Sequence, residues 1–412
     1  MSIFDKKVGV IGLGYIGLPT ALSLAANGVD VIGVDVKKEI VDSLKSGQVT
    51  FEEDGLQGLY EAAVAKKMEF STVYPSADIY VVTMPTPYDE RTKKVDASYI
   101  VRAVDCVLDV MPKGATVVVE STVSPGTIDD HVRPLFAKRG LTLGVDAHIA
   151  HAPERIIPGN MLYELEHNAR TIGADEPEIG ELVKELYGSF CKGEIVTTDI
   201  RTAEMTKVVE NTFRSINIAY ANELAKLCRQ NGMDVREVIR IANKHPRVNI
   251  LSPGPGVGGH CISVDPWFLV GDYGESLAEL TFAAVSVNAS MPEYTLGRIA
   301  DVMEANHITD NSRVGLYGLT YKEDVDDTRE SPTLQLLDCM RKHLAKGFKV
   351  YDPFVKHQMC DGQVFSLDEF LGSVDMVVLL VGHSEIKQNM DKLKGKLVLD
   401  TRNVCPFAQE RL

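Results

Sequence analysis

The sequence predicts an α/β protein with three parts: an N-terminal Rossmann domain, a central helical domain with a long helix, and a C-terminal Rossmann-like α/β domain. Three observations lead to this prediction. Short apolar segments alternate with helical segments in the first half of the chain, a long stretch near the middle repeats its apolar residues at helical spacing, and the alternation then returns. A chain of 412 residues also exceeds what one hydrophobic core usually supports.

The strands of the first domain are expected at four apolar segments, residues 8–11, 29–35, 79–83 and 115–120. A helix should follow the first of them from about residue 18. Alternation of this kind predicts a parallel sheet that helices cover on both faces.

The central domain is expected to be helical. Between residues 202 and 231 apolar residues recur at steps of three and four, which predicts a long amphipathic helix. Residues 246–266 are rich in Gly and Pro and should form an ordered loop rather than a helix. Two further helices are expected at residues 279–287 and 293–306.

The third domain should begin after a polar turn at residues 310–312. Helices or loops are expected to separate its strands, which we place at residues 314–321, 349–351, 376–381 and 397–400. The predicted domains are therefore residues 1–200, 201–309 and 310–412.

The charge of the chain narrows the classes of partner. Lys and Arg total 43 against 58 Asp and Glu, which gives a formal net charge of -15. This balance argues against nucleic acid or an anionic membrane as a partner, because both need a basic surface. No apolar run approaches the roughly 20 residues of a membrane span, and we expect a cytoplasmic protein.

The seven cysteines are scattered and include no C-x-x-C pair, which disfavours a disulfide framework and a zinc site. We expect no bound metal. Cys261 follows the glycine-rich residues 254–259, a loop that we expect to be flexible with an exposed backbone, so that an electrophile could approach the thiol closely. A buried, unreactive thiol explains the same position about equally well. The other six cysteines are expected to be ordinary packing residues.

The segment Gly12-Leu-Gly14-Tyr-Ile-Gly17 follows the first predicted strand and begins the first predicted helix. This is the context in which a G-x-G-x-x-G pattern binds a dinucleotide. Gly12 allows the tight turn, Gly14 lets the backbone approach a pyrophosphate, and Gly17 permits close packing of the helix on the strand. Tyr15 and Ile16 belong to the same predicted contact.

Asp35 ends the next strand, 18 residues after Gly17, where its carboxylate can accept hydrogen bonds from a ribose. A carboxylate there favours NAD over NADP, since it would repel the extra phosphate. Lys37 and Lys38 leave NADP as an alternative, and a strand-to-helix turn without a ligand is the second alternative.

A polar stripe is expected on the long helix. Lys207, Asn211 and Arg214 stand at positions i, i+4 and i+7. A solvent-exposed face is the ordinary interpretation of such a stripe. An amide between two cations would also suit an anionic substrate or a developing oxyanion.

Together these residues resemble the UDP-glucose/GDP-mannose dehydrogenase family, whose members oxidise the C6 hydroxyl of a nucleotide sugar to a carboxylate with two NAD+. The resemblance spans nearly the whole chain. It includes residues 12–17, 84–87, 120–122, 152–155, 203–207 with Asn211, 258–261 and 328–331. Within the family, three segments resemble the branch that acts on UDP-N-acetyl-D-mannosamine, namely residues 245–250, 253–261 and 264–268.

The resemblance implies roles for individual residues. Cys261 would be the nucleophile, Lys207 the general acid/base and Asn211 the group that steadies the oxyanion. Asp265 and Glu154 would be carboxylates near the reacting carbon. Contacts to NAD are implied for Thr86, Thr122 and Arg329. Of these, Thr122 would orient water or the cofactor. Contacts to the substrate are implied for Arg155, Ile156, Lys207, Asn211, Arg214, His245, Arg247, Gly258, Tyr321 and Lys322, with His245 and Arg247 reaching a neighbouring subunit.

Two departures bear on the sugar. Members that act on UDP-glucose commonly carry Lys where this chain has Val264, and an acidic residue where it has Pro158. Both favour a UDP-N-acetylhexosamine, with the manno epimer preferred and the gluco epimer as the alternative. The resemblance also implies a homodimer or a higher homo-oligomer. A two-electron β-hydroxyacid dehydrogenase and a non-catalytic nucleotide-sugar binding protein are competing interpretations.

Overall fold

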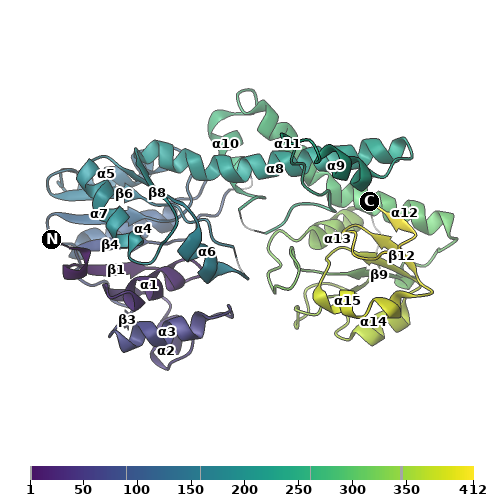
Figure 1. Ribbon diagram of the computed structural model, residues 1–412, viewed down its shortest axis with the longest axis horizontal. Helices are drawn as coiled ribbons and strands as arrows, with labels where there is room; N and C mark the ends of the chain where they lie inside the picture. The colour runs from purple at the N-terminus through teal and green to yellow at the C-terminus, as the bar shows by residue number, and fades with distance from the viewer. Residues whose placement is uncertain (1, 90, 158, 260, 344–346) are drawn as a thin grey trace. The chain divides into compact units, whose positions relative to one another are not determined.

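The computed structural model describes residues 2–89, 91–157, 159–259, 261–343 and 347–412 (Figure 1). The chain divides into two compact units, Met1–Glu210 and Asn211–Leu412. The division falls inside the longest helix, α8 (Ile200–Gln230). Each unit contains one β-sheet.

The first unit is built on an eight-stranded sheet with the order β3-β2-β1-β4-β5-β6-β7-β8. Neighbouring strands are parallel except for β6 and β7, which are antiparallel. The strands are β1 (Lys7–Ile11), β2 (Asp30–Val34), β3 (Glu69–Ser71), β4 (Ile79–Val82), β5 (Ala115–Val119), β6 (Ala147–His151), β7 (Arg170–Ala174) and β8 (Ile195–Thr198).

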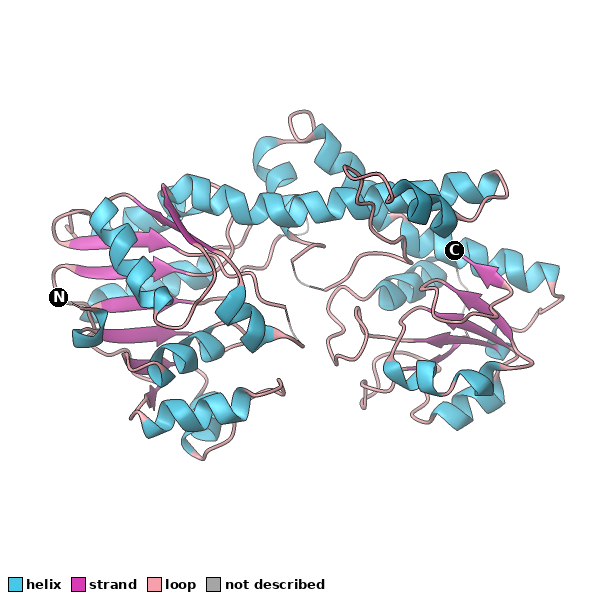
Figure 2. Cartoon of the chain, viewed as in Figure 1, coloured by secondary structure: helices cyan, strands magenta, loops and turns pink. Residues whose placement is uncertain are grey.

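Helices pack on both faces of this sheet (Figure 2). One core contains Leu22 of α1, Tyr60 of α3 and Leu186 of α7, and the other contains Val104 of α4 and Phe136 of α5. The helices are α1 (Gly17–Ala26), α2 (Lys38–Lys45), α3 (Leu56–Ala65), α4 (Ser98–Val110), α5 (Arg133–Lys138), α6 (Met161–His167) and α7 (Pro177–Gly188), with short turns at Ile3–Asp5 and Ile128–Val132.

The second unit combines helices with a five-stranded parallel sheet of order β10-β9-β11-β12-β13. The strands are β9 (Val314–Tyr317), β10 (Lys349–Tyr351), β11 (Met376–Leu379), β12 (Leu397–Asp400) and β13 (Glu410–Arg411). The helices are α9 (Val235–Ala242), α10 (Asp265–Tyr273), α11 (Glu279–Ala289), α12 (Met291–Ala305), α13 (Pro332–Lys342), α14 (Leu367–Ser373) and α15 (Ser384–Gln388), with short turns at Asn311–Arg313 and Met390–Leu393.

The predicted fold class is confirmed, with three corrections of detail. The first sheet is not wholly parallel, because β7 runs against β6. The strand predicted at residues 314–321 ends at Tyr317. Beyond it, the backbone N–H groups of Leu319 and Thr320 donate to the carboxylate of Asp352 and not to a neighbouring strand. The helix predicted from residue 293 already begins at Met291.

The exposed surface of α8 also differs from the simple amphipathic prediction. Several apolar side chains of the predicted buried face are about half-exposed or more, among them Phe213, Tyr220 and Leu227. No helix in the described part of the chain has the length and apolar character needed to cross a bilayer.

Candidate active site

The glycine-rich turn lies at the carboxyl end of β1, where the order β2-β1-β4 reverses the direction in which strands are added. Ligands of open α/β sheets bind at this position. Gly12 adopts a φ of +96°, and a Cβ atom at Gly17 would lie 1.9 Å from the Gly12 carbonyl oxygen. A Cβ atom at Gly14 would meet nothing within 4 Å. The exposed backbone at Gly14 therefore fits the close approach of a pyrophosphate.

Asp35 follows β2 and faces this turn. Its Oδ2 accepts the Leu13 N–H at 2.9 Å, and its Oδ1 accepts the Lys37 N–H at 2.9 Å. Asp35 remains partly exposed, so its oxygens keep acceptor positions for ribose hydroxyls. Beside the turn, the exposed ring of Tyr15 packs on Phe51 with centroids 4.4 Å apart.

Two threonines occupy the carboxyl ends of the neighbouring strands. Thr86 follows β4 and is buried, while Thr122 follows β5 and is partly exposed. The hydroxyl of Thr83 donates to the Gly12 carbonyl at 2.7 Å, which ties the end of β4 to the glycine turn. Both predicted contacts therefore lie at the same sheet edge as the turn.

A buried ion cluster lies at the carboxyl ends of β5 and β6. Arg170, the first residue of β7, pairs through Nη1 with Glu120 at 3.2 Å and through Nη2 with Glu154. The backbone N–H of Arg155 donates to the other oxygen of Glu154 at 2.6 Å. Sequence reasoning assigned no role to Glu120 or Arg170. The signal that could have found them is a charged residue at the boundary of an apolar strand, since Glu120 directly follows β5 and Arg170 begins β7.

The pKa of Glu120 is raised to about 7, first by burial. Arg170 lowers this pKa and the neighbouring Glu154 raises it. The cluster thus places two carboxylates and one guanidinium away from water, and one of the carboxyls takes up a proton far more readily than an exposed glutamate.

Arg155 and Ile156 follow Glu154 in the chain. Arg155 is engaged inside the first unit: its Nη2 lies 2.7 Å from Glu210 and donates to Thr171 at 2.9 Å, and its Nη1 donates to the Ala169 carbonyl. Ile156 is buried. Pro158, a predicted departure from the UDP-glucose pattern, lies outside the described residues.

The polar stripe on α8 is mostly buried. Lys207 and Asn211 are one helical turn apart and are 6% and 4% exposed, whereas Arg214 is exposed. The solvent-exposed interpretation is therefore wrong for Lys207 and Asn211 and correct for Arg214. A lysine and an amide with so little access to water require polar partners.

Asn211 is linked to the predicted nucleophile through Asp265. Its Nδ2 donates to Oδ2 of Asp265 at 2.6 Å. Asp265 is the first residue of α10, and its N–H donates to the carbonyl of Cys261 at 2.8 Å. Cys261 itself is exposed. The turn before α10 therefore carries the exposed Cys261, and a backbone hydrogen bond ties this residue to Asp265, whose carboxylate is buried and bound by an amide.

The glycine-rich loop before Cys261 is packed, contrary to the expectation of a flexible loop with exposed backbone. Gly259 adopts a φ of +86°, and its N–H donates to the Arg329 carbonyl at 2.9 Å. A Cβ atom at Gly258 would lie 2.5 Å from the Glu330 carbonyl oxygen and 2.8 Å from Cβ of Tyr321. These glycines are needed because the segment around Tyr321 covers them. His260 lies outside the described residues.

The covering segment carries three predicted site residues. The N–H of Tyr321 donates to the Asp327 carbonyl at 3.0 Å, and the same aspartate accepts from Nε of Arg329 at 3.0 Å. Burial raises the pKa of Tyr321. Lys322 and Arg329 are exposed.

Three further basic residues of the second unit are two on an exposed turn and one arginine after β12. His245 and Arg247 lie together on an exposed turn, where the Arg247 N–H donates to Nδ1 of His245 at 3.3 Å. Arg402 follows β12 and was not predicted. Its Nε donates to the Leu380 carbonyl at 2.8 Å, and its pKa is lowered to about 10 by burial and by the nearby Arg236.

None of the seven cysteines forms a disulfide. Four of the six that were expected to be packing residues are buried, namely Cys191, Cys228, Cys360 and Cys405. Cys339 is half-buried and Cys106 is exposed, so the packing interpretation is wrong for Cys106. No three His, Cys, Asp or Glu side chains gather as metal ligands would in the described part of the chain.

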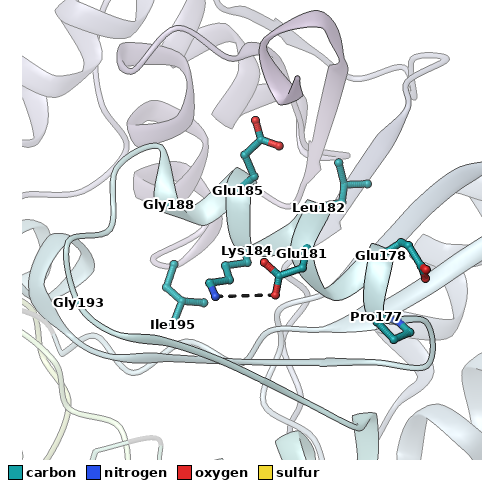
Figure 3. Close-up of a pocket in the computed structure, with 9 residues that line it drawn as sticks. All are labelled: Pro177, Glu178, Glu181, Leu182, Lys184, Glu185, Gly188, Gly193 and Ile195. Carbon is teal, nitrogen blue, oxygen red and sulfur yellow. Dashed lines mark ion pairs between the residues drawn. The ribbon is translucent and has the colours of Figure 1, made fainter. Parts of the chain in front are cut away.

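A groove of about 880 Å³ runs along α7 in the first unit (Figure 3). Glu178, Glu181 and Glu185 line it, and the one lysine drawn there, Lys184, pairs with Glu181 at 3.8 Å. None of the predicted site residues lines this groove. The candidate dinucleotide site therefore rests on the sheet edge of the first unit, and the candidate thiol site rests on the Cys261 turn of the second unit.

Models of three domains of the UDP-glucose/GDP-mannose dehydrogenase family match the chain in order. The NAD binding domain matches residues 6–191, the central domain residues 201–290 and the UDP binding domain residues 315–406.

Individual relatives cover nearly the whole chain. A UDP-N-acetyl-D-mannosamine dehydrogenase of Methanococcus maripaludis is 41% identical and spans 97% of this chain and 93% of its own. An NDP-N-acetyl-D-galactosaminuronic acid dehydrogenase of Ralstonia nicotianae is 39% identical, with 98% and 97% covered. The solved UDP-N-acetyl-mannosamine dehydrogenase Cap5O of Staphylococcus aureus is 40% identical, covers 98% of this chain and 97% of its own, and has a TM-score of 0.86.

Proposed function

This chain belongs to the UDP-glucose/GDP-mannose dehydrogenase family, and on that premise we propose that it oxidises C6 of UDP-N-acetyl-D-mannosamine to give UDP-N-acetyl-D-mannosaminuronate. The enzyme is an NAD-dependent nucleotide-sugar dehydrogenase. The observation that carries the chemical proposal is the connected set Cys261, Asp265 and Asn211: a turn that carries an exposed cysteine is bound through its backbone to Asp265, and the Asn211 amide fixes the Asp265 carboxylate.

The first oxidation uses Lys207 and Asn211. NAD+ supplies the hydride acceptor when it is bound. Lys207 takes the proton of the C6 hydroxyl as general base. The Asn211 amide has two N–H groups, of which one serves Asp265 and the second can donate to the developing oxyanion.

Covalent capture explains the thiol. The thiolate of Cys261 adds to the aldehyde carbon to form a thiohemiacetal, and at this tetrahedral carbon the existing C–H hydrogen can leave as a hydride in the second oxidation. The product of that oxidation is a thioester on Cys261. Water then attacks the thioester carbonyl, the C–S bond breaks, and Glu154 or Asp265 accepts the proton of the water.

The four-electron scheme is tested by counting. Two NADH per sugar oxidised are expected, and one NADH with accumulating aldehyde would overturn it. Replacement C261S should abolish acid formation, since a hydroxyl is a poorer nucleophile and leaving group than a thiolate. Unchanged turnover in C261S would remove the thiol from the mechanism.

The sugar is proposed from the relatives and from Val264. UDP-N-acetyl-D-glucosamine is the alternative, since the two epimers differ at one stereocentre. Comparison of kcat/KM for the two epimers decides between them, and a clear preference for the gluco sugar would overturn the proposal. The UDP binding domain at residues 315–406 accounts for the second α/β sheet, which a two-electron β-hydroxyacid dehydrogenase does not need.

A homodimer through α8 is part of the proposal. Phe213, Tyr220 and Leu227 are spaced by seven residues and are 66%, 50% and 49% exposed. Side chains at this spacing share one helix face, and such an apolar stripe suits packing against a second copy. The double replacement of Phe213 and Tyr220 with Ser should give monomers in light scattering, and an unchanged mass would contradict this interface.

Three related proposals concern the partner subunit, the compartment and the domains. His245 and Arg247 are exposed and would contact the nucleotide sugar held by the partner of a dimer.

We place the enzyme in the cytoplasm, where reducing conditions keep the thiol of Cys261 available. We also retain the division into domains of residues 1–200, 201–309 and 310–412, which assigns Lys207 and Cys261 to the central helical domain.

A further inference from the structure

Arg170 is the central group of a cluster in which three charged side chains are withdrawn from water. The side chains of Arg170, Glu120 and Glu154 are 4%, 0% and 4% exposed. The guanidinium lies 4.3 Å from the ring centroid of Tyr187 and 5.3 Å from that of Phe190, which hold it in place on one side. It also pairs with the two carboxylates.

Stability alone is a weak explanation of this arrangement. Desolvating an ion pair costs about as much as the attraction returns, and apolar side chains of equal volume are often as stable. Two carboxylates for one guanidinium add a further cost, because like charges repel. The Oε2 atom of Glu120 has no hydrogen-bond partner among the described residues, which increases that cost.

The location of the cluster indicates chemistry. Glu120 directly follows β5 and Glu154 lies three residues after β6, at the sheet edge that carries the dinucleotide turn. The hydroxyl of Thr20, in the helix that begins at this turn, donates to Oε1 of Glu120 at 3.4 Å. The cluster therefore adjoins the place where ligands of such sheets bind.

The contacts of Glu154 fix its carboxylate and still leave it able to act. Oε2 pairs with Arg170, and Oε1 accepts the N–H of Arg155. A carboxylate offers about four acceptor positions, so one remains on each oxygen. Such a group is held in one orientation and can still accept a proton from water.

We propose that Arg170 is a positioning residue for hydrolysis of the Cys261 thioester: it holds the Glu154 carboxylate in one orientation, and Glu120 anchors the opposite side of its guanidinium. The assignment rests on the proposed function. Water adds to the thioester carbonyl and gives its proton to Glu154, the C–S bond breaks, and the Cys261 thiolate leaves. No electrons are exchanged in this step.

The assignment predicts that Arg170 serves one step only. In Arg170→Lys, the positive charge is kept, but one ammonium group cannot pair with both carboxylates as the two Nη atoms of the guanidinium do. We expect a rapid burst of about two NADH per subunit at a rate within about 3-fold of the wild type, followed by a steady state slowed at least about 30-fold. The thioester should accumulate on Cys261 and appear in the intact mass.

A small nucleophile tests the same point from the other side. Hydroxylamine cleaves thioesters without the help of a protein base, so it should restore steady turnover to Arg170→Lys. Glu154→Gln should behave in the same way as Arg170→Lys. Accumulation in Glu154→Gln but not in Arg170→Lys, or a burst and steady state slowed together without adduct, would overturn the role of Arg170.

Arg133→Lys is the matched control. Arg133 also bridges two carboxylates of the first unit, Asp175 at 2.6 Å and Asp129 at 2.5 Å, but at the surface. The Arg133→Lys variant should leave both the NADH burst and the steady-state rate unchanged. A wild-type enzyme that releases one NADH per sugar and forms no adduct would overturn the proposed function itself, which separates that failure from the failure of this assignment.

Glu120→Gln provides a second variant that keeps the shape of the cluster. The groups that face Glu120 are Arg170 of β7, Glu154, Tyr187 of α7 and Thr20 of α1. In this variant one side of the guanidinium loses its ionic anchor, so Glu154 is held less firmly. The steady-state rate should fall by about 3-fold or more at an unchanged burst rate, and an unchanged steady state would contradict the anchoring role.

Discussion

The two sheets of this protein use the same turn for different purposes. After β1, Gly12 has a φ of +96°, and the next N–H, of Leu13, donates to Asp35 at the end of the neighbouring strand. After β9, Gly318 has a φ of +102°, and the next N–H, of Leu319, donates to Asp352 beside the neighbouring strand β10. In both cases the glycine N–H donates to the last carbonyl of that strand, at 2.7 and 2.8 Å.

The two turns differ in the course of the chain beyond the glycine. In the first unit a helix begins at Gly17 and the backbone at Gly14 stays exposed. In the second unit no helix begins until Pro332, and Asp352 is buried against His383 at 3.1 Å. One turn is left open for a dinucleotide, whereas the other is closed by the chain itself and supports the segment that covers the Cys261 loop.

The largest expected effect is on the closed turn. Replacement of Asp352 with Ala should lower the free energy of unfolding of the second unit by about 3–5 kcal/mol. The reason is that His383 and the N–H groups of Leu319 and Thr320 would lose their buried hydrogen-bond partner. The fluorescence of Trp267, the one tryptophan of the chain, reports this unit. Asp35→Ala in the open turn should cost about 1 kcal/mol. Equal losses would contradict the distinction.

The next effect is on the loop that the closed turn supports. Gly258→Ala should lower the free energy of unfolding by about 2–3 kcal/mol, because the new Cβ would overlap the Glu330 carbonyl. Sugar oxidation should fall at least about 100-fold through displacement of Cys261, while titration with NADH should still show binding. Gly297→Ala in α12 meets nothing within 4 Å and is the control.

Two buried carboxyls, one in each unit, should contribute to stability with opposite dependence on pH. The pKa of Glu120 is raised by burial from 4.5 to about 7, so stability falls as pH rises across that window. The pKa of Asp352 is lowered: burial raises it, but His383 and backbone N–H groups outweigh burial. Its contribution is therefore present above pH 3.8 and lost in more acid solution.

Urea unfolding at several pH values measures both responses. Relative to the wild type, the free energy of unfolding of Glu120→Gln should rise by about 2 kcal/mol between pH 5 and 8. The advantage of the wild type over Asp352→Asn should shrink between pH 4 and 2. A Glu120→Gln variant with the same pH dependence as the wild type would show that this carboxyl does not titrate in the folded state.

The smallest effect on folding is expected at the open turn. Gly14→Ala should leave the free energy of unfolding within about 0.5 kcal/mol of the wild type, since its Cβ meets no protein atom. The same methyl group would obstruct a pyrophosphate, and KM for NAD should rise about 10-fold or more. Gly17→Ala is the contrasting variant, because it should impair folding itself.

Much of the fold could be read from the sequence because its elements are strongly patterned. The apolar run at residues 8–11 corresponds to β1, and the helical periodicity at residues 202–231 corresponds to α8. The strand predicted at residues 314–321 was too long, because the sequence cannot show that Asp352 takes the N–H groups of Leu319 and Thr320.

The candidate site was only partly accessible to the same reasoning. The glycine turn with Asp35 is a local motif, and its spacing reflects a geometry that two adjacent strands impose. Arg170 lies 50 residues from Glu120 and 16 from Glu154, and no local pattern reveals that one guanidinium joins them. The burial of Lys207 and Asn211 likewise depends on what covers α8.

The sequence by itself determined the α/β class, the open dinucleotide turn and the identity of the one cysteine that follows a run of glycines, since these depend on neighbours along the chain. Tertiary structure decided the state of each side chain. It packed the glycine loop beneath Tyr321, bound Asn211 to Asp265 and enclosed Arg170 between two carboxylates. Burial and charge pairing depend on residues far apart in sequence, and only folding brings these together.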